Sequence, residues 1–203
     1  MFTSDNKKVY CYIFIAFLAS IFVNLALINS TKQTKEDLIS DYYETENLVS
    51  ASPHSLRKKM TDGKNDYILV DTRSAQEYEK AHITGAISIP AYKDPDHSAY
   101  DQVDRIVGEF AKLPKDKEII LYCYSTPCMT SRKIGKMLAE KNIFVKHLNI
   151  GWNEWRYDWT SWNHEHEWAN TKATDYITSG KEPGVVPGGL VPPDCTLNGD
   201  TGC

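Results

Sequence analysis

The sequence has no marked excess of charge of either sign: 23 lysine and arginine residues stand against 27 aspartate and glutamate residues, for a net charge of −4. This balance gives no indication of a nucleic-acid partner. The chain also lacks a clear Ala-x-Ala cleavage site after its one long apolar run, which argues against a cleaved signal peptide. Its 203 residues, 41% of them hydrophobic, are enough for one ordinary domain with tails.

The apolar run covers residues 9–28 and contains no charged side chain. A helix of this length crosses a hydrocarbon layer of about 30 Å. We therefore predict that residues 1–30 form a transmembrane anchor, with a signal peptide as the alternative. Lys7 and Lys8 before the run favour a cytoplasmic N-terminus, although Lys32 and Lys35 weaken the bias. The prediction is a single-pass membrane protein whose globular part faces the periplasm or the cell exterior.

Composition divides the rest of the chain into three parts. Residues 31–46 are polar and are predicted to be a juxtamembrane spacer, and residues 47–168 are predicted to form the globular domain. Residues 169–203 are rich in proline and glycine and are predicted to form an irregular tail. This tail contains Cys195 and Cys203, which could close a disulfide in an oxidising compartment.

Short apolar strands alternate with helices in the globular part, a pattern typical of an α/β domain with a largely parallel sheet. We expect a short edge strand at Leu48 and Val49. Ser52 is a plausible N-cap, and Ser74 with Glu77 fits a capping box. Helices are expected at 53–60, 74–80, 101–113 and 131–141, and further strands at 67–70, 86–89, 119–122 and 144–148.

Cys123 directly follows the apolar strand 119–122 and precedes a polar loop and a helix. Ligands of parallel sheets bind at the carboxyl ends of strands. Backbone N–H groups converging there favour negative charge and lower the pKa of a thiol, which makes the thiolate available as a nucleophile. The competing interpretation is that Cys123 is only a small buried hydrophobic residue.

Several motifs now occur together and in order: Val70-Asp71-Thr72-Arg73, Glu77-Tyr78, the run from Ala81 to Pro90, Leu121-Tyr122-Cys123, and the run from Leu148 to Trp155. Together they resemble the rhodanese domain, whose usual pattern includes Asp-x-Arg and Gly-His-Ile-x-Gly-Ala-x-x-Ile-Pro. A match in several parts is far more specific than a single motif. The resemblance implies the rhodanese-like fold, a five-stranded parallel sheet flanked by helices.

The resemblance also implies sulfur transfer. Cys123 would take the outer sulfur of a small anionic donor such as thiosulfate as a persulfide, and pass it to a thiol or cyanide. No metal or organic cofactor is implied. The resemblance implies a structural role, joining strands and loops, for Asp71, Arg73, Glu77, His82 and Gly85. The donor would be held by the loop residues Tyr124, Ser125, Thr126, Pro127, Met129, Thr130, Ser131 and Arg132.

The loop departs from the usual Cys-x-x-Gly-x-x-Ser pattern: it is longer by about two residues and lacks the glycine that allows a tight curl. Met129 stands six positions after Cys123, where rhodanese-fold phosphatases have an arginine. Cys128 is an addition to the pattern. It could release the persulfide sulfur by forming a disulfide with Cys123, act with Cys123 as a redox pair, be a bystander, or be the nucleophile itself.

Aromatic residues recur at helical spacing after residue 151, at Trp152, Trp155, Trp159 and Trp162. We expect one helix whose aromatic face packs on the domain, or else lines a groove for a protein partner. His164 and His166 follow with the alternating spacing of a strand, and no further ligand is evident from the sequence, so no metal site is predicted. A catalytically silent binding module stays open as a third function, beside sulfur transfer and redox exchange.

Overall fold

The computed structural model describes residues 4–30 and 33–186 of the chain. The chain divides into two compact units, Met1–Thr45 and Glu46–Cys203, and each is described by itself. Cys195 and Cys203 lie outside the described residues, so the expected disulfide between them stays a prediction.

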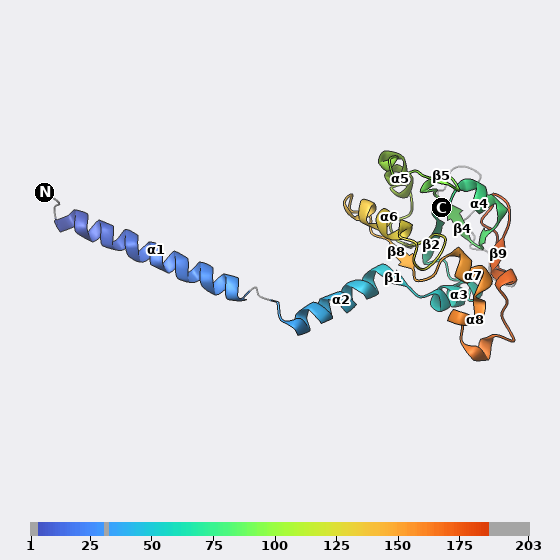
Figure 1. Ribbon diagram of the computed structural model, residues 1–203, viewed down its shortest axis with the longest axis horizontal. Helices are drawn as coiled ribbons and strands as arrows, with labels where there is room; N and C mark the ends of the chain where they lie inside the picture. The colour runs from blue at the N-terminus through green and yellow to red at the C-terminus, as the bar shows by residue number, and fades with distance from the viewer. Residues whose placement is uncertain (1–3, 31–32, 187–203) are drawn as a thin grey trace. The chain divides into compact units, whose positions relative to one another are not determined.

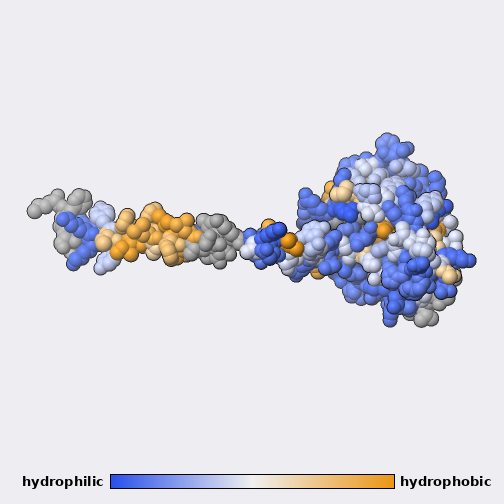
Figure 2. All heavy atoms as spheres, turned by 60° about the horizontal axis from the view of Figure 1, so that its bottom comes forward, coloured by the Kyte–Doolittle hydropathy of each residue, from blue (hydrophilic) through white to orange (hydrophobic). Residues whose placement is uncertain are grey.

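The first unit contains helix α1 (Ser4–Ser30) and most of helix α2 (Lys35–Val49). Residues Asn6–Leu25 of α1 are long and apolar enough to cross a membrane, as a signal sequence would also be, and their side chains are exposed (Figure 2). The polar spacer is helical from Lys35. Thr34 and Asp37 start the helix by exchanging hydrogen bonds between side chain and backbone, at 2.9 and 3.1 Å.

A five-stranded parallel sheet forms the centre of the second unit, as predicted (Figure 1). The strand order is β1-β8-β7-β2-β4, so β7 is the central strand. The expected edge strand at Leu48 and Val49 is wrong: both residues end α2, and the edge strand starts one residue later. The strands are β1 (Ser50–Ala51), β2 (Tyr67–Asp71), β4 (Ala86–Ser88), β7 (Glu118–Tyr122) and β8 (Lys146–Leu148).

Alternating side chains of the strands fill two separate cores, one on each face of the sheet. Ile120 and Tyr122 of β7 point into the core beneath α3, α4, α7 and α8, while Ile119 and Leu121 point into the core beneath α5 and α6. The helices are α3 (Pro53–Thr61), α4 (Ala75–Lys80), α5 (Val103–Phe110), α6 (Thr130–Ala139), α7 (Trp152–Tyr157) and α8 (Trp159–Trp162).

Local capping signals begin two of these helices as expected. The Ser52 side chain accepts a hydrogen bond from the N–H of Ser55 at the start of α3. At the start of α4, the side chains of Ser74 and Glu77 each accept a hydrogen bond from the other residue's N–H, which is the predicted capping box. The turn into α4 therefore positions Glu77 near the end of β2.

The aromatic segment is not one helix. It breaks at Asp158 into α7 and α8, so the predicted continuous stripe is wrong. Trp152, Trp155 and Trp159 are nevertheless buried in the first core, where Trp155 contacts Trp159 and Trp162 through their rings. These indoles serve packing, which is one of the two expected roles. A protein partner at this segment stays a prediction.

The segment after residue 168 packs on the domain up to the end of the described residues, which its proline and glycine content did not indicate. Strand β9 (Ile177–Thr178) pairs antiparallel with β3 (His82–Ile83), and Tyr176 is buried. The N–H of Gly85, at φ 82°, donates to the carbonyl of Pro183. The remaining elements are the hairpin β5 (Tyr92–Asp94) and β6 (His97–Ser98) and the 3-10 helices η1 (Glu165–Glu167) and η2 (Ala173–Tyr176).

Candidate functional site

Cys123 lies at the carboxyl end of the central strand β7, and Cys128 returns to it from the loop that leads into α6. The two Sγ atoms are 3.1 Å apart, and both cysteines are free thiols. Only 3% of Cys123 is exposed, whereas Cys128 is half-buried. The loop therefore brings two thiols into contact and leaves one of them accessible from outside.

The chain just after β8 holds the base of this loop. The N–H groups of Trp152 and Asn153 donate to the carbonyls of Cys123 and Tyr124, each at 2.8 Å. Gly151 packs so closely against this backbone that a Cβ there would overlap atoms of Tyr124 and Ser125. The absence of a side chain at Gly151 is therefore what allows the loop to sit at the strand end.

Glu154 ties the same two segments together. One of its carboxylate oxygens accepts the N–H of Thr126 in the loop, and the other accepts the N–H of Gly151, both at 2.9 Å. The loop N–H of Cys128 is also occupied, since it donates to the carbonyl of Ser125. The N–H of Thr126, one of the loop residues expected to hold an anionic donor, and the N–H of Cys128 are thus already bonded within the protein.

Hydroxyl groups surround the thiol pair on the side of α6. Thr130 lies 3.4 Å from the Cys128 sulfur, and the hydroxyls of Tyr92 and Tyr100 lie 3.0 and 2.6 Å from the hydroxyl of Thr130. Tyr124 meets Tyr92 edge to face, with ring centroids 5.3 Å apart. Tyr92 and Tyr100 come from the β5–β6 region, and no local signal in the sequence connects them to the cysteine loop.

The two thiols share one proton unequally. The hydrogen-bond contact between the two sulfur atoms, with the hydroxyl and N–H of Thr130 and the N–H of Tyr124, lowers the pKa of Cys128 to about 5 despite partial burial. The same contact with Cys128, together with burial, raises the pKa of Cys123 well above its usual value. At neutral pH the negative charge therefore resides on Cys128, the more exposed sulfur.

Arg132 does not extend freely into the loop. Its Nη1 donates to the carbonyls of Thr126 and Cys128 at 3.3 and 3.2 Å, so the guanidinium closes the loop onto the first turn of α6. Thr126, Pro127 and Met129 are exposed, whereas Thr130 and Ser131 are buried at the start of that helix. The exposed side chains of the loop on either side of Cys128 are therefore uncharged.

Asp71 and Arg73 form a buried ion pair at the end of β2, the strand beside β7. Arg73 Nη2 lies 2.6 Å from Asp71 Oδ2 and also donates to the carbonyl of Ala81. The hydroxyl of Tyr122 donates to the same carboxylate at 2.6 Å. The guanidinium lies over the ring of Trp152, 4.4 Å from its centroid. These contacts join the end of β2 to Ala81, Tyr122 and Trp152, which fits a structural role for the pair.

Glu77 and His82 also bind other parts of the fold. The hydroxyl of Tyr124 donates to Glu77 Oε2 at 2.6 Å, which fixes the residue after Cys123 to the start of α4. The ring of His82 stacks on Tyr78 at 3.8 Å, and its Nδ1 lies 2.8 Å from the Tyr78 carbonyl. His82 is fully buried and its ring is engaged by protein atoms, which does not suit a general base.

Comparison with known proteins gives one family. The profile of the rhodanese-like domain matches residues 52–158. The chain belongs to the rhodanese-like domain family. That span contains four of the five strands of the sheet, Cys123 and Cys128, and the motif at Asp71 and Arg73. It does not contain β1, or α8 and the segment that follows it.

Parts of this chain are similar to a known regulator and to solved structures. The HTH-type transcriptional regulator Rv0324 of Mycobacterium tuberculosis is 31% identical over 88 residues, which is 43% of this chain and 34% of the regulator. The chain thus spans about a third of that relative's length. The BH2092 protein of Bacillus halodurans is 27% identical, with a TM-score of 0.47 over 61% of this chain and 82% of that one. The rhodanese-like domain of Alr3790 from Anabaena sp. is 16% identical, with a TM-score of 0.38 over 51% and 67%.

Proposed function

We propose that this protein is a sulfurtransferase that carries sulfane sulfur as a persulfide on Cys123 and releases it through Cys128. The observation that carries the proposal is the 3.1 Å distance between the two sulfur atoms at the end of the central strand. Membership of the rhodanese-like family supports sulfur chemistry at this position of the fold.

In the first step, the proton shared by the pair passes to Cys128 and the Cys123 thiolate attacks the outer sulfur of thiosulfate. A bond forms between the two sulfurs, the S–S bond of thiosulfate breaks, and sulfite leaves with the electron pair. The N–H of Tyr124 lies beside the sulfur atoms and offsets the charge of the persulfide.

Cys128 makes a second step available. The Cys128 thiol passes its proton to the outer sulfur of the persulfide, and the resulting thiolate attacks Cys123 Sγ. The S–S bond of the persulfide breaks, and hydrosulfide leaves with the electron pair as the Cys123–Cys128 disulfide forms. A small thiol such as glutathione then reduces the disulfide and restores the pair. Alternatively, cyanide or an acceptor thiol removes the outer sulfur before Cys128 reacts. Attack by Cys128 would release the sulfur as sulfide, whereas attack by an acceptor would transfer it, and the faster of the two reactions would determine the product.

Transfer and release can be measured separately in the full-length protein. We expect Cys123→Ser to abolish both thiocyanate formation from thiosulfate and cyanide and sulfide release. Cys128→Ser should keep thiocyanate formation but lose sulfide release in a single turnover without added thiol. Thiocyanate formation that persists in Cys123→Ser and disappears in Cys128→Ser would show that Cys128 is the nucleophile and contradict the proposal.

A second function, thiol–disulfide exchange, is favoured by the differences in exposure and in pKa between the two thiols. Cys128 is the more exposed and has its pKa lowered to about 5, while Cys123 is buried with a raised pKa. An accessible thiolate with a buried partner suits attack on a disulfide substrate. In that case oxidised glutathione, and not thiosulfate, would oxidise the pair, and Cys123→Ser would trap glutathione on Cys128.

For localisation, we propose that α1 stays in the membrane and that the rhodanese-like unit faces away from the cytoplasm. Lys7 and Lys8 before the apolar segment support this orientation. The protein should resist extraction at alkaline pH, and protease added to spheroplasts should digest the rhodanese-like unit. Digestion only after the membrane is broken would contradict the orientation, and release at alkaline pH would contradict the anchor.

A further inference from the structure

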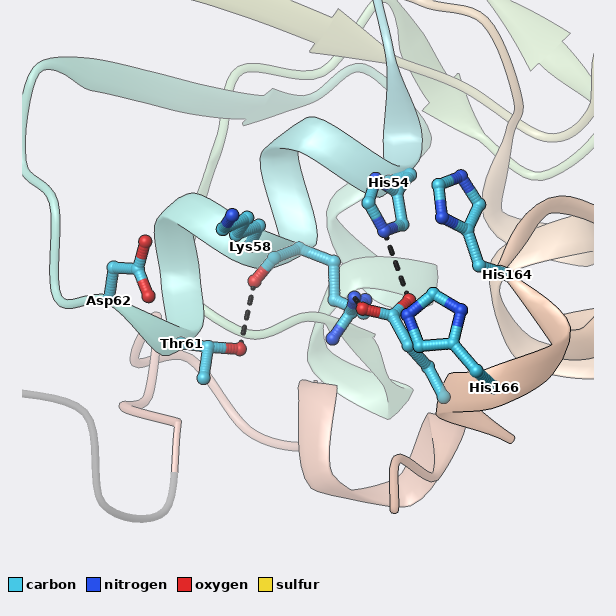
Figure 3. A pocket seen from close by; sticks show the side chains of 8 residues that line it. His54, Lys58, Thr61, Asp62, His164 and His166 are labelled. Atoms are coloured by element: carbon cyan, nitrogen blue, oxygen red, sulfur yellow. Dashed lines mark hydrogen bonds and ion pairs between the residues drawn. The ribbon is translucent and has the colours of Figure 1, made fainter. Parts of the chain in front are cut away.

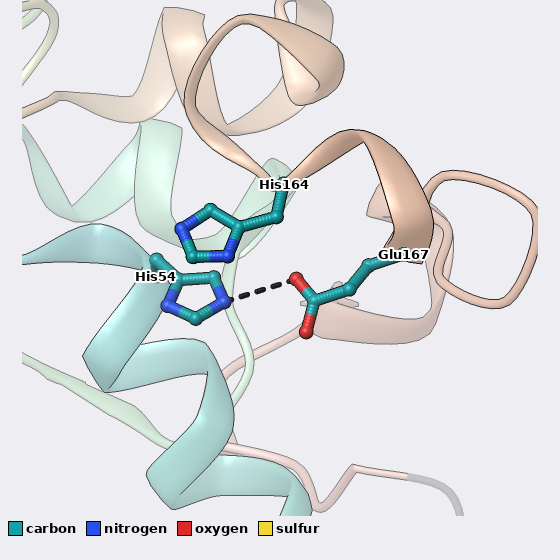
Figure 4. Close-up of side chains that lie close together, drawn as sticks. All are labelled: His54, His164 and Glu167. Carbon is teal, nitrogen blue, oxygen red and sulfur yellow. Dashed lines mark hydrogen bonds and ion pairs between the residues drawn. The ribbon is translucent and has the colours of Figure 1, made fainter.

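A second cluster of side chains with potential ligand atoms, two histidines and a glutamate, lies outside the thiol loop, between α3 and η1. His54 comes from the first turn of α3, and His164 and Glu167 flank and end η1 (Figure 4). One imidazole nitrogen from each histidine and one carboxylate oxygen all lie within 4.8 Å of one another. The rhodanese-like match ends before His164, so this cluster combines a helix of the domain with the segment that follows it.

The cluster lines an open pocket of about 400 Å³ (Figure 3). His54 Nε2 lies 3.0 Å from Glu167 Oε2, and the rings of His54 and His164 stack with centroids 3.9 Å apart. His166 lines the same pocket, with its ring 5.7 Å from that of His164. Imidazole nitrogens and a carboxylate therefore converge on one space that is open to solvent.

We propose that His54, His164 and Glu167 bind a divalent transition-metal ion, with Zn²⁺ as the best match. Two imidazole nitrogens and one carboxylate oxygen are a donor set that zinc takes in proteins with one position left open. Zinc bonds of about 2.0–2.1 Å place tetrahedral ligand atoms about 3.4 Å apart. The cluster is near this spacing, because its ligand atoms are all within 4.8 Å and one pair is at 3.0 Å.

Binding needs one change that the structure can accommodate. A metal ion lies in the plane of each imidazole that binds it, so the parallel stack of His54 and His164, with 12° between planes, has to open. His164 is exposed and free to tilt, whereas His54 is half-buried and held against Glu167. The fourth position is filled by water or by His166 from the same pocket.

Arg57 forms an ion pair with the Glu167 carboxylate, through the oxygen that does not contact His54. It is 4% exposed, and its Nη2 lies 2.7 Å from Glu167 Oε1. This contact leaves Oε2, the oxygen beside His54, directed towards the cluster. Carboxylate ligands of metals are commonly held in this way by a second hydrogen-bonding group. Because the ligands are separated by more than a hundred positions in the chain, a bound ion would also fasten η1 to α3.

The test is a titration of the full-length protein in detergent micelles with Co²⁺, followed by displacement with Zn²⁺. We expect visible absorption bands of Co²⁺ bound by nitrogen and oxygen, without the near-ultraviolet charge-transfer band of a thiolate ligand. His164→Ala and Glu167→Gln should each weaken binding by at least about tenfold. The double variant Cys123→Ser/Cys128→Ser should bind like the wild type.

His97→Ala is the matched control, since His97 also contacts a carboxylate, Asp94 at 2.8 Å, on the surface of the hairpin. It should leave Co²⁺ binding unchanged. Thermal unfolding gives an independent readout: Zn²⁺ should raise the melting temperature of wild type and of His97→Ala, but not of His164→Ala. Because His164 is exposed, its variant is expected to fold normally without metal.

Three results would overturn the proposal: no Co²⁺ binding, binding lost with the cysteines and kept in His164→Ala, or equal weakening in His97→Ala. Stabilisation by sulfate with no effect of metal would also overturn it, because Arg57 and Lys58 would then make the pocket an anion site.

Discussion

Strands β2 and β7 lie side by side with Asp71 opposite Tyr122, yet their ends carry polar groups with opposite properties. Asp71 and Arg73 are buried, with hydrogen bonds to Tyr122 and Ala81 and a ring contact with Trp152. Cys123 and Cys128 share one proton, and Cys128 reaches the surface. The same edge of the sheet thus holds one fully buried pair, to which we assign a structural role, and one partly exposed pair, which we propose to be reactive.

The largest expected effect comes from breaking the first pair. Asp71→Ala leaves the Arg73 guanidinium buried without its carboxylate, and we expect the free energy of unfolding to fall by about 3–5 kcal/mol. Denaturant titration followed by tryptophan fluorescence measures this. Asp101→Asn is the control: it breaks the exposed pair with Lys93 and should cost less than about 1 kcal/mol. Equal losses would contradict the structural role of Asp71.

The second effect tests how the reactive pair is held. Gly151→Ala forces a Cβ into the backbone of Tyr124 and Ser125, which we expect to cost about 1–3 kcal/mol and to slow disulfide formation between the two thiols. Gly108→Ala is the matched control, because no atom lies within 4 Å of a Cβ there and helix α5 should become slightly more stable. An unchanged rate of disulfide formation in Gly151→Ala would show that this close approach does not position the loop.

A smaller effect concerns the charge on Cys128. Thr130→Val removes a hydroxyl that lowers the pKa of Cys128, so we expect this pKa to rise from about 5 by about one unit. The pH dependence of Cys128 alkylation by iodoacetamide, followed by peptide mass, gives the midpoint. Thr126→Val removes a hydroxyl of the same loop that lies 3.4 Å from the Asn149 carbonyl, and should leave the midpoint in place.

The charge on Cys128 also makes stability depend on pH. In the reduced protein Cys128 is deprotonated above about pH 5 when folded, whereas an unfolded cysteine keeps its proton to about pH 8.5. The unfolded state therefore binds more protons between these values, and the free energy of unfolding should increase with pH across this interval. In Cys128→Ser this contribution should vanish. An identical pH profile in both proteins would show that Cys128 has no lowered pKa.

Local features of the sequence were sufficient to predict four of the five strands of the sheet, β2, β4, β7 and β8, because strand periodicity and caps such as Ser74 with Glu77 act within a few residues. The position of Cys123 at the end of a strand followed in the same way, whereas the central place of that strand in the sheet came from the structure. The break at Asp158 was not predictable from aromatic spacing, since the tryptophans bury their rings on either side of it.

Contacts between segments that are distant in the sequence could not be predicted from local patterns either. Tyr92 and Tyr100 approach Thr130 across the fold, and His54 meets Glu167 after a separation of 113 residues. The sequence around each of these residues is typical of an ordinary hairpin, turn or helix and does not indicate a site. Their chemistry arises only when the chain is folded, so the surroundings of the thiols and the histidine cluster needed the structure.

The most direct test of the account is the mass of one tryptic peptide after a single turnover with thiosulfate. Cleavage after Lys117 and Arg132 gives peptide 118–132, which contains Cys123 and Cys128 and no other cysteine of the chain. We predict that this peptide loses two hydrogens in the wild type, gains one sulfur in Cys128→Ser and is unchanged in Cys123→Ser. A gained sulfur in Cys123→Ser, or an unchanged peptide in all three proteins, would contradict sulfur transfer through the Cys123–Cys128 pair.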